Sequence, residues 1–141
     1  MSDDLERFVT AQEKVYEHAL AEIKVGEKKS HWMWFVFPQL AGLGRTSISI
    51  HYSLHGLDEA RAYLAHPVLG PRLMECFEAV LSVKGRSARE IFSTPDDLKL
   101  RSSATLFSLI SPANSIFHRV LERYYNGEPD PATLKLLDNE T

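Results

Sequence analysis

Hydrophobic residues recur along most of the chain with the spacing of an α-helix. The first such stretch places Leu5, Phe8, Val15 and Ile23 on one stripe, and Gly26 supplies a stop signal after it. Later stretches show the same period and are bounded by prolines and glycines. The pattern predicts helices over residues 4–24, 58–65, 67–83, 87–92, 95–110, 112–125 and 131–138.

The region from residue 30 to residue 54 allows more than one interpretation. Ser30 can cap a short helix through HWMWFVF that Pro38 ends, but the same aromatic residues also suit a buried strand. The alternation in SISIHY is typical of a strand, although one short strand has no evident partner. Because helix signals dominate elsewhere, we predict an all-α fold: a single compact multi-helix domain over residues 1–141, with the aromatic segment at its centre.

The composition is that of an ordinary globular chain. Of the 141 residues, 44% are hydrophobic and 25% are charged, which excludes wholesale disorder. The formal net charge of −3 supplies no overall basic field, so neither a nucleic acid nor a membrane partner is expected. A single cysteine cannot form an internal disulfide, the polar N-terminus resembles no signal peptide, and the longest apolar run is far too short to cross a bilayer. These features predict a cytoplasmic protein.

Both tryptophans, Trp32 and Trp34, lie one residue apart in the stretch KKSHWMWFVFPQLAGLGRTS. In one interpretation this stretch is a core segment whose polar tips find hydrogen-bond partners. In the other it is the wall of a pocket, since Lys28, Lys29 and Arg45 flank the aromatic residues. Flat rings beside positive charges suit a nucleotide-like or other anionic ligand.

Two further motifs are weaker signals. The segment GLGRTS, residues 42–47, could turn backbone N–H groups toward an anion, but it lacks the spacing of a P-loop, and a plain tight turn is the simpler interpretation. His51, His55 and Glu59 follow one another at spacings of four. Because Gly56 interrupts any helix that would align them, no metal site is predicted.

Nucleophilic catalysis has little support in the sequence. Cys76 falls on the apolar face of the expected helix 67–83, where a small buried hydrophobic residue is the default interpretation. No serine lies in a Gly-x-Ser-x-Gly pattern. A pair of carboxylates stays open as an acid and a base, because sequence does not show which residues meet in space. We therefore assign no catalytic residue and expect no cofactor.

Five segments between residues 8 and 137 carry a family resemblance: FVTAQ, SHWMWFVFPQLAGLG, AYLAHPVLGPRL, KLRSSATLF and GEPDPATLKLL. They resemble a bacterial family of unknown function, domain of unknown function 1810, whose members often carry the label calpastatin-like; nothing in this chain gives that label physical support. The resemblance implies a compact all-helical single domain and no established activity. The positions that fit the family's signature are His31, Trp32, Trp34, Pro38, Gln39, Gly42, Gly44, Tyr52, His66, Pro67, Gly70, Arg72, Lys99, Ser102, Thr105 and Phe107.

Many of these positions are polar, and a hydrophobic core by itself does not require residues such as His31, Gln39, Arg72 or Lys99. They favour a shared polar pocket, so the first hypothesis is a domain that binds a small anionic or nucleotide-like ligand next to a tryptophan ring. The ligand-binding residues predicted on this basis are His31, Trp32, Trp34, Gln39, Arg45, Tyr52, Arg72, Lys99, Ser102 and Thr105.

Two alternatives from other functional classes stay open. A hydrolase acting on nucleotide or ADP-ribose derivatives would use His31 or Asp97 as acid or base, and it requires a titratable group beside the pocket. A protein-interaction module would instead expose an apolar surface of roughly several hundred Å². A protein partner is therefore kept open beside the small anionic ligand.

Overall fold

The regular secondary structure of residues 5–140, the part of the chain that the computed structural model describes, is α-helical and contains no β-strand. The predicted all-α fold is therefore confirmed. The helices are α1 (Glu6–Glu13), α2 (Tyr16–Val25), α3 (Met33–Val36), α4 (Ser47–His51), α5 (Leu57–Ala65), α6 (Leu69–Ser82), α7 (Ala88–Phe92), α8 (Asp96–Ser108), α9 (Ile116–Tyr125) and α10 (Pro131–Glu140).

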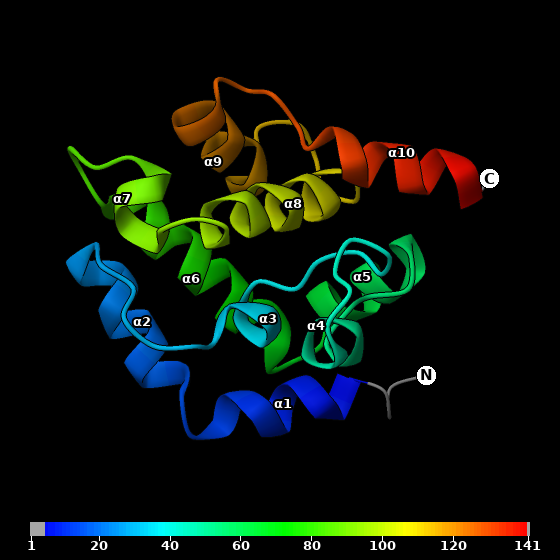
Figure 1. Ribbon diagram of the computed structural model, residues 1–141, viewed down its shortest axis with the longest axis horizontal. Helices are drawn as coiled ribbons and strands as arrows, with labels where there is room; N and C mark the ends of the chain where they lie inside the picture. The colour runs from blue at the N-terminus through cyan, green and yellow to red at the C-terminus, as the bar shows by residue number, and fades with distance from the viewer. Residues whose placement is uncertain (1–4, 141) are drawn as a thin grey trace.

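Helices α6 and α8 run through the middle of the molecule and organise the others around them (Figure 1). The contacts of α6 are with α2, α5 and α9, whereas α8 packs against α5, α7, α9 and α10. Short α3 lies over α1. Over residues 5–140, no helix combines the length and the apolar character that crossing a bilayer demands.

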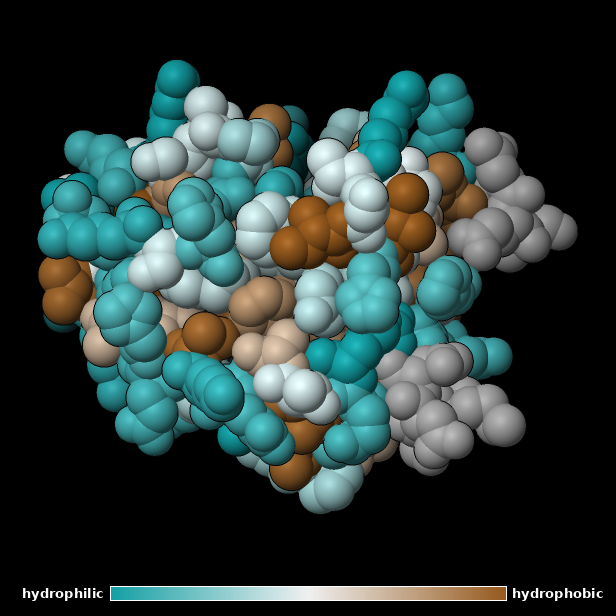
Figure 2. All heavy atoms as spheres, turned by 60° about the horizontal axis from the view of Figure 1, so that its bottom comes forward, coloured by the Kyte–Doolittle hydropathy of each residue, from teal (hydrophilic) through white to brown (hydrophobic). Residues whose placement is uncertain are grey.

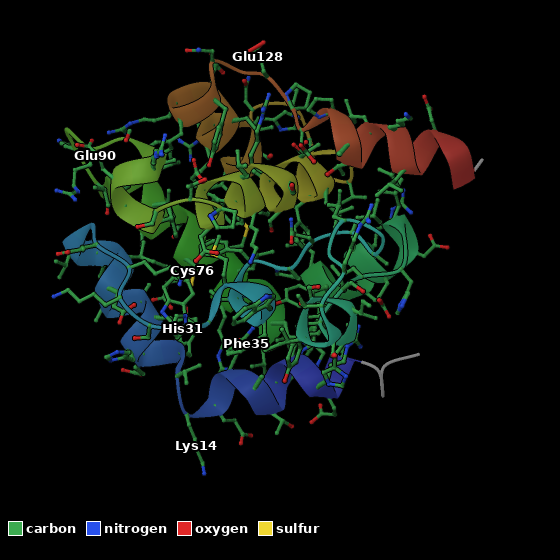
Figure 3. The ribbon with its side chains drawn as sticks, viewed as in Figure 1. Lys14, His31, Phe35, Cys76, Glu90 and Glu128 are labelled. Carbon is green, nitrogen blue, oxygen red and sulfur yellow. The ribbon has the colours of Figure 1, made fainter. Side chains whose placement is uncertain are left out.

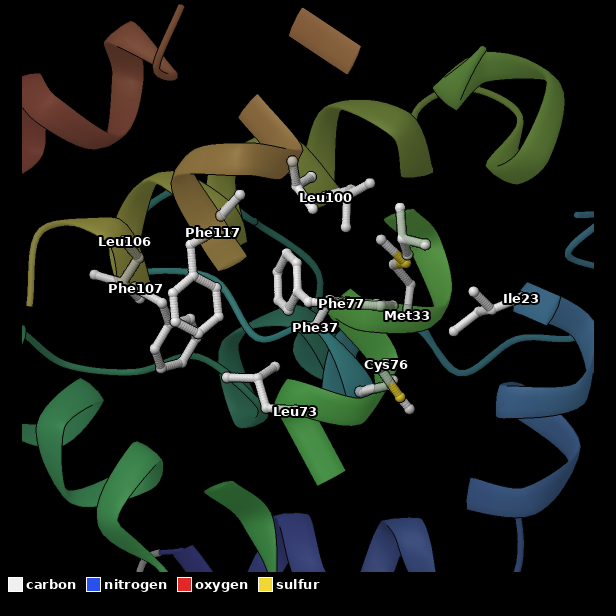
Figure 4. Packing of buried hydrophobic residues seen from close by; sticks show 14 of the residues in the cluster. Ile23, Met33, Phe37, Leu73, Cys76, Phe77, Leu100, Leu106, Phe107 and Phe117 are labelled. Carbon is white, nitrogen blue, oxygen red and sulfur yellow. The ribbon is translucent and has the colours of Figure 1, made fainter. Parts of the chain in front are cut away.

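The aromatic segment lies at the centre of the core, as predicted (Figure 4). The ring of Phe37 meets those of Phe77 and Phe92 edge-on, at centroid distances of 5.0 and 6.0 Å. Phe77 in turn packs on Phe117, which contacts Phe107. All five rings are fully buried. Edge-to-face pairs of this kind add to the free energy of burial, so the aromatic residues link α6, α7, α8 and α9 into one core.

The single helix predicted over residues 4–24 is wrong, because the chain turns between α1 and α2. Residue 4 itself lies outside the described range. Gln12 is buried near the end of α1, where its amide nitrogen donates to the backbone oxygen of Phe35 at 2.6 Å and to the hydroxyl of Tyr63 at 3.1 Å. With Gln12 drawn inward, α1 packs on α3, and the turn at residues 14–15 lets α2 pack on α6.

The predicted helix 112–125 begins later, at Ile116. Ser111 does not cap it, because its hydroxyl donates back to the carbonyl oxygen of Phe107 at 2.8 Å. Ser115 is the cap, and its hydroxyl oxygen accepts from the backbone N–H of His118. The other predicted helices agree with the structure to within about two residues at most boundaries.

The strand alternative for SISIHY is also wrong, since Ser47–His51 is α4. The side chains of Thr46 and Ser49 form a reciprocal capping box at its start. Ile48 and Ile50, which gave the alternating pattern, are 40% and 57% exposed. The alternation therefore does not mark a buried face, and an isolated bridge between Leu40 and Leu54 is the only strand-like pairing in residues 5–140.

Candidate functional site

A cavity of about 420 Å³ lies between the segment after α3, the start of α4, the first half of α8 and the start of α10. Small-molecule sites commonly have volumes of about 300–1,000 Å³. Five of the ten predicted ligand-binding residues line it, namely Trp34, Gln39, Arg45, Lys99 and Ser102. We call this cavity the Trp34–Lys99 pocket. Its other lining residues are Leu43, Gly44, Thr46, Ile48, Ser49, Pro95, Leu98, Asp130 and Ala132.

The turn that carries Arg45 is shaped by close backbone packing. A Cβ atom at Gly44 would lie 2.3 Å from the Oγ atom of Ser49, so a larger residue does not fit there without movement of α4. The Oγ1 atom of Thr46 accepts from the Ser49 N–H at 3.2 Å, and Ser49 Oγ accepts from the Thr46 N–H at 3.1 Å. These contacts hold Arg45 at the rim of the pocket, immediately before the helix.

A lysine and a tryptophan pair inside the pocket. The ammonium nitrogen of Lys99 lies 5.1 Å from the centroid of the Trp34 ring and 3.4 Å from the Asp96 carboxylate. The other oxygen of Asp96 is bound by Lys28 at 2.8 Å. Because the closer Lys28 offsets the charge of Asp96, the group of three keeps a net charge of +1, and Lys99 remains a cation available to a ligand.

Several polar groups of the pocket make no hydrogen bond or ion pair with any other described residue. The guanidinium of Arg45 is exposed and has no hydrogen bond or ion pair within residues 5–140. The same holds for the side-chain amide of Gln39 and the indole N–H of Trp34, both partly buried. Together these groups supply hydrogen-bond donors and one amide acceptor that a ligand can use.

Asp130, which is not among the predicted ligand-binding residues, is the acidic residue of the pocket. Its Oδ2 atom accepts from the Ser102 hydroxyl at 3.0 Å, the Thr133 N–H at 3.0 Å and the Thr133 hydroxyl at 2.6 Å. Its backbone N–H donates to Thr105 Oγ1 at 2.8 Å. The predicted site residue Thr105 therefore lies behind the pocket, fully buried, and holds Asp130 in place.

The two adjacent predicted residues His31 and Trp32 lie away from the pocket. Trp32 is 1% exposed, and its indole N–H donates to Glu22 Oε1 at 2.8 Å. Backbone N–H groups of Lys29 and Ser30 donate to the same oxygen at 3.0 and 3.1 Å. Burial acts to raise the pKa of Glu22, but the hydrogen bonds from these residues outweigh it and lower that pKa to about 2. Trp32 is thus a core residue, and exposed His31 lies beside α2 and α3 (Figure 3).

The last two predicted residues, Tyr52 and Arg72, make their contacts elsewhere in the molecule. The ring of Tyr52 lies 5.3 Å from that of Phe35 and 5.8 Å from that of Phe8. Arg72 donates to the side-chain oxygen of buried Gln12 at 3.3 Å and covers the ring of Tyr16. Neither residue lines the Trp34–Lys99 pocket.

The residues considered for catalysis are dispersed. Among residues 5–140, no three His, Cys, Asp or Glu side chains are grouped to hold a metal ion. Burial raises the pKa of the Cys76 thiol to about 12, so Cys76 is a core residue rather than a nucleophile. His31 and Asp97, the acid or base of the hydrolase hypothesis, do not line the pocket.

A larger cavity, of about 1,100 Å³, is formed by α5, the C-terminal end of α8 and α10. Leu109 and Leu134 give it an apolar wall. Its arginine, Arg61, is paired with Asp58 at 2.9 Å, and Glu59 and Asp138 line the cavity as well, so one positive and three negative charges disfavour an anion there. On the face shown in Figure 2, hydrophobic residues form separate patches within a largely hydrophilic surface.

Comparisons with known proteins agree with the family resemblance. A family model described as "Protein of unknown function (DUF1810)" matches residues 2–137. The crystal structure of the conserved hypothetical protein Rv1873 from Mycobacterium tuberculosis is similar, with 52% sequence identity, a TM-score of 0.93 and coverage of 96% of each chain. No protein with a curated description matches the chain. These comparisons support the all-helical fold and attach no ligand or reaction to it.

Proposed function

The chain belongs to the DUF1810 family of proteins of unknown function, and we propose that it binds a small organic anion in the Trp34–Lys99 pocket. The proposal is carried by one observation. Lys99 from α8 and Arg45 from the turn before α4 line the same cavity, next to the partly buried ring of Trp34. The two cations come from distant parts of the chain, so their convergence is a property of the fold.

The charge of the pocket supports an anionic ligand. Its charged lining residues are Arg45 and Lys99, which are positive, and Asp130, which is negative, so two positive charges and one negative charge leave +1. Arg45 has no partner among the described residues, and its planar guanidinium can make two parallel hydrogen bonds to a carboxylate or phosphate. Lys99 adds a point charge from α8.

The apolar side chains of the pocket support a ligand with a carbon body. Trp34 and Leu43 are partly buried, while Ile48 is 40% and Leu98 is 54% exposed on its walls. A ligand that covers these side chains removes apolar surface from water, which favours binding. A flat ring placed against Trp34 gains a stacking contact as well. A nucleotide-like compound combines such a body with an anionic group.

Thermal unfolding in the presence of ligands tests the proposal. The purified protein is heated with AMP, ADP-ribose, NAD, ribose 5-phosphate and inorganic phosphate in turn. A ligand present at about one hundred times its dissociation constant stabilises the folded protein by about 2.7 kcal/mol, which raises Tm by several degrees. We expect at least one organic anion of this panel to produce such a shift.

Charge-removing variants locate the site of binding. Arg45→Gln and Lys99→Gln each remove one cation of the pocket, and we expect either change to reduce the ligand-induced shift strongly. Arg89→Gln is the matched control, because Arg89 is also exposed and lies outside the pocket. No shift with any member of the panel, or a shift that Arg45→Gln and Lys99→Gln leave intact, contradicts the proposal.

A further inference from the structure

We infer that the ligand of the Trp34–Lys99 pocket is a phosphate ester that also carries free hydroxyl groups, and that the carboxylate of Asp130 binds those hydroxyls. The inference rests on the proposed function, because it names the class of ligand for the same pocket. Sugar phosphates and nucleotides share this chemistry. Asp130 shares the pocket with Arg45 and Lys99, two cations that by themselves would suit a plain anion.

Asp130 is held rigidly at the pocket by its surroundings. Its Oδ2 atom accepts three hydrogen bonds, one from Ser102 and two from Thr133, and its N–H is bound by Thr105. The second carboxylate oxygen, Oδ1, accepts no hydrogen bond from any residue within 5–140. Asp130 thus keeps one acceptor atom for a ligand while the other atom fixes the orientation of the carboxylate.

A carboxylate is unfavourable in a site for a bare anion, because like charges repel at short distance. The same carboxylate is favourable when the ligand presents a hydrogen-bond donor to it. Gln39 lines this pocket as well and offers both a donor and an acceptor that no described residue uses. Hydroxyl groups can both donate and accept, so they match Asp130 and Gln39 together.

The net charge of the lining residues indicates that the hydrogen-bond donors of the ligand are hydroxyl groups and not an ammonium group. Arg45, Lys99 and Asp130 sum to +1. A zwitterionic ligand is neutral overall, and its ammonium group would approach two cations of the pocket. A phosphate monoester carries about −1.5 to −2 at neutral pH and its hydroxyls carry no charge, so it complements the pocket better.

Calorimetric titration with two closely matched nucleotides tests the inference. AMP and 2′,3′-dideoxyadenosine 5′-monophosphate differ only in the two ribose hydroxyls. We expect the wild-type protein to bind AMP at least about tenfold more tightly, a difference of about 1.4 kcal/mol. We expect Asp130→Asn to lose most of this preference, while its affinity for the dideoxy nucleotide stays the same or increases because a negative charge is gone.

The control separates loss of the carboxylate from damage to the start of α10. Asparagine caps a helix about as well as aspartate, so Asp130→Asn retains the cap. Thr133→Val removes the hydrogen bond that the Thr133 hydroxyl donates to Asp130 but leaves the carboxylate in place, and Thr133 does not line the pocket. We therefore expect Thr133→Val to retain the preference for AMP.

Each result of the titrations has a distinct meaning. Equal binding of the two nucleotides by the wild-type protein overturns the hydroxyl inference and leaves the proposed anion site standing. A preference for AMP that survives in Asp130→Asn overturns the role of Asp130. Binding of neither nucleotide and of no ribose 5-phosphate overturns the inference, whereas the proposed function fails only if the other anions of the thermal-shift panel do not bind either. The comparison of nucleotides in the wild-type protein does not depend on the folding of any variant.

Discussion

The ammonium group of Lys99 lies 5.1 Å from the centroid of the Trp34 ring, and both side chains line one cavity. The neighbouring tryptophan has an analogous partner, since Lys28 lies 5.0 Å from the ring of Trp32. Asp96 binds both lysines. The two pairs differ in exposure: the Lys28 side chain is 6% exposed and Trp32 is buried, whereas Lys99 is 24% exposed and Trp34 borders the pocket. One tryptophan therefore belongs to the core and the other to the candidate site.

This difference predicts how ligand binding changes the fluorescence of the protein. An anion that binds Lys99 or covers Trp34 alters the surroundings of that indole and leaves buried Trp32 unaffected. We expect AMP to change the emission of the wild-type protein but to cause little change in Trp34→Phe, measured with excitation of tryptophan. An undiminished signal in Trp34→Phe would place the bound nucleotide away from Trp34. Urea unfolding of the variant checks that its core is intact.

A second prediction concerns acid and the carboxylate of Glu22. Because the folded pKa of about 2 lies below the ordinary value of 4.5, Glu22 contributes stability above pH 4.5 and loses that contribution as the pH falls toward 2. The Glu22 side chain is 9% exposed, and the shift corresponds to about 3 kcal/mol at neutral pH. We expect Glu22→Gln to lower the free energy of unfolding by an amount of this order at pH 7.

Urea titrations from pH 7 down to pH 2.5 measure this effect. The difference in free energy of unfolding between the wild-type protein and Glu22→Gln should shrink as the pH falls below 4.5. Glu90 is the control, because its pKa is also lowered by a backbone N–H, that of Ser87, but its carboxylate is at the surface. Glu90→Gln should have a much smaller effect. If Glu22→Gln lowered the free energy of unfolding by the same amount at every pH, the negative charge of Glu22 would not be what stabilises its contacts with Lys29, Ser30 and Trp32.

A third prediction uses the close approach of α5 and α6. A Cβ atom at Gly70 would lie 2.1 Å from the carbonyl oxygen of Leu64, which belongs to the backbone of α5. Alanine is favoured over glycine in a helix by about 1 kcal/mol, so propensity alone predicts that Gly70→Ala stabilises the protein. We expect the clash to dominate and the free energy of unfolding to fall by about 2 kcal/mol or more.

Thermal or urea unfolding decides between these two effects. Glu78→Ala introduces alanine at an exposed position of the same helix and should change the free energy of unfolding by less than about 0.5 kcal/mol. If Gly70→Ala were as stable as the wild-type protein, α5 and α6 would have to be farther apart than the structure places them.

The helical fold could be predicted from the sequence because the hydrophobic spacing of a helix recurs along most of the chain, between prolines and glycines. The break between α1 and α2 could not, since it depends on Gln12 reaching Phe35 and Tyr63 from distant parts of the chain. SISIHY was ambiguous for a different, local reason. Its isoleucines follow a strand pattern, but the local capping box of Thr46 and Ser49 determines the backbone.

Only half of the predicted ligand-binding residues line the candidate site, because long-range contacts decide which residues meet there. Nothing local separates Trp32 from Trp34, but Trp32 is packed into the core, where its indole N–H donates to Glu22 from α2. Asp130 was not predicted as a site residue, and its place in the same cavity as Lys99 follows from the packing of α10 on α8. Residues that meet only through tertiary contacts leave no signal in one sequence.

Chemical-shift mapping by NMR tests the central claim most directly. Assigned ¹H–¹⁵N spectra are recorded while AMP is added to the full chain. The account predicts shifts of the Trp34 indole N–H and of backbone amides in residues 43–49 and 98–102, with no change for the indole N–H of Trp32, which is bound to Glu22. Shifts confined to another surface, such as that around Arg119, or no shift at millimolar AMP, would contradict the assignment of the Trp34–Lys99 pocket as the ligand site.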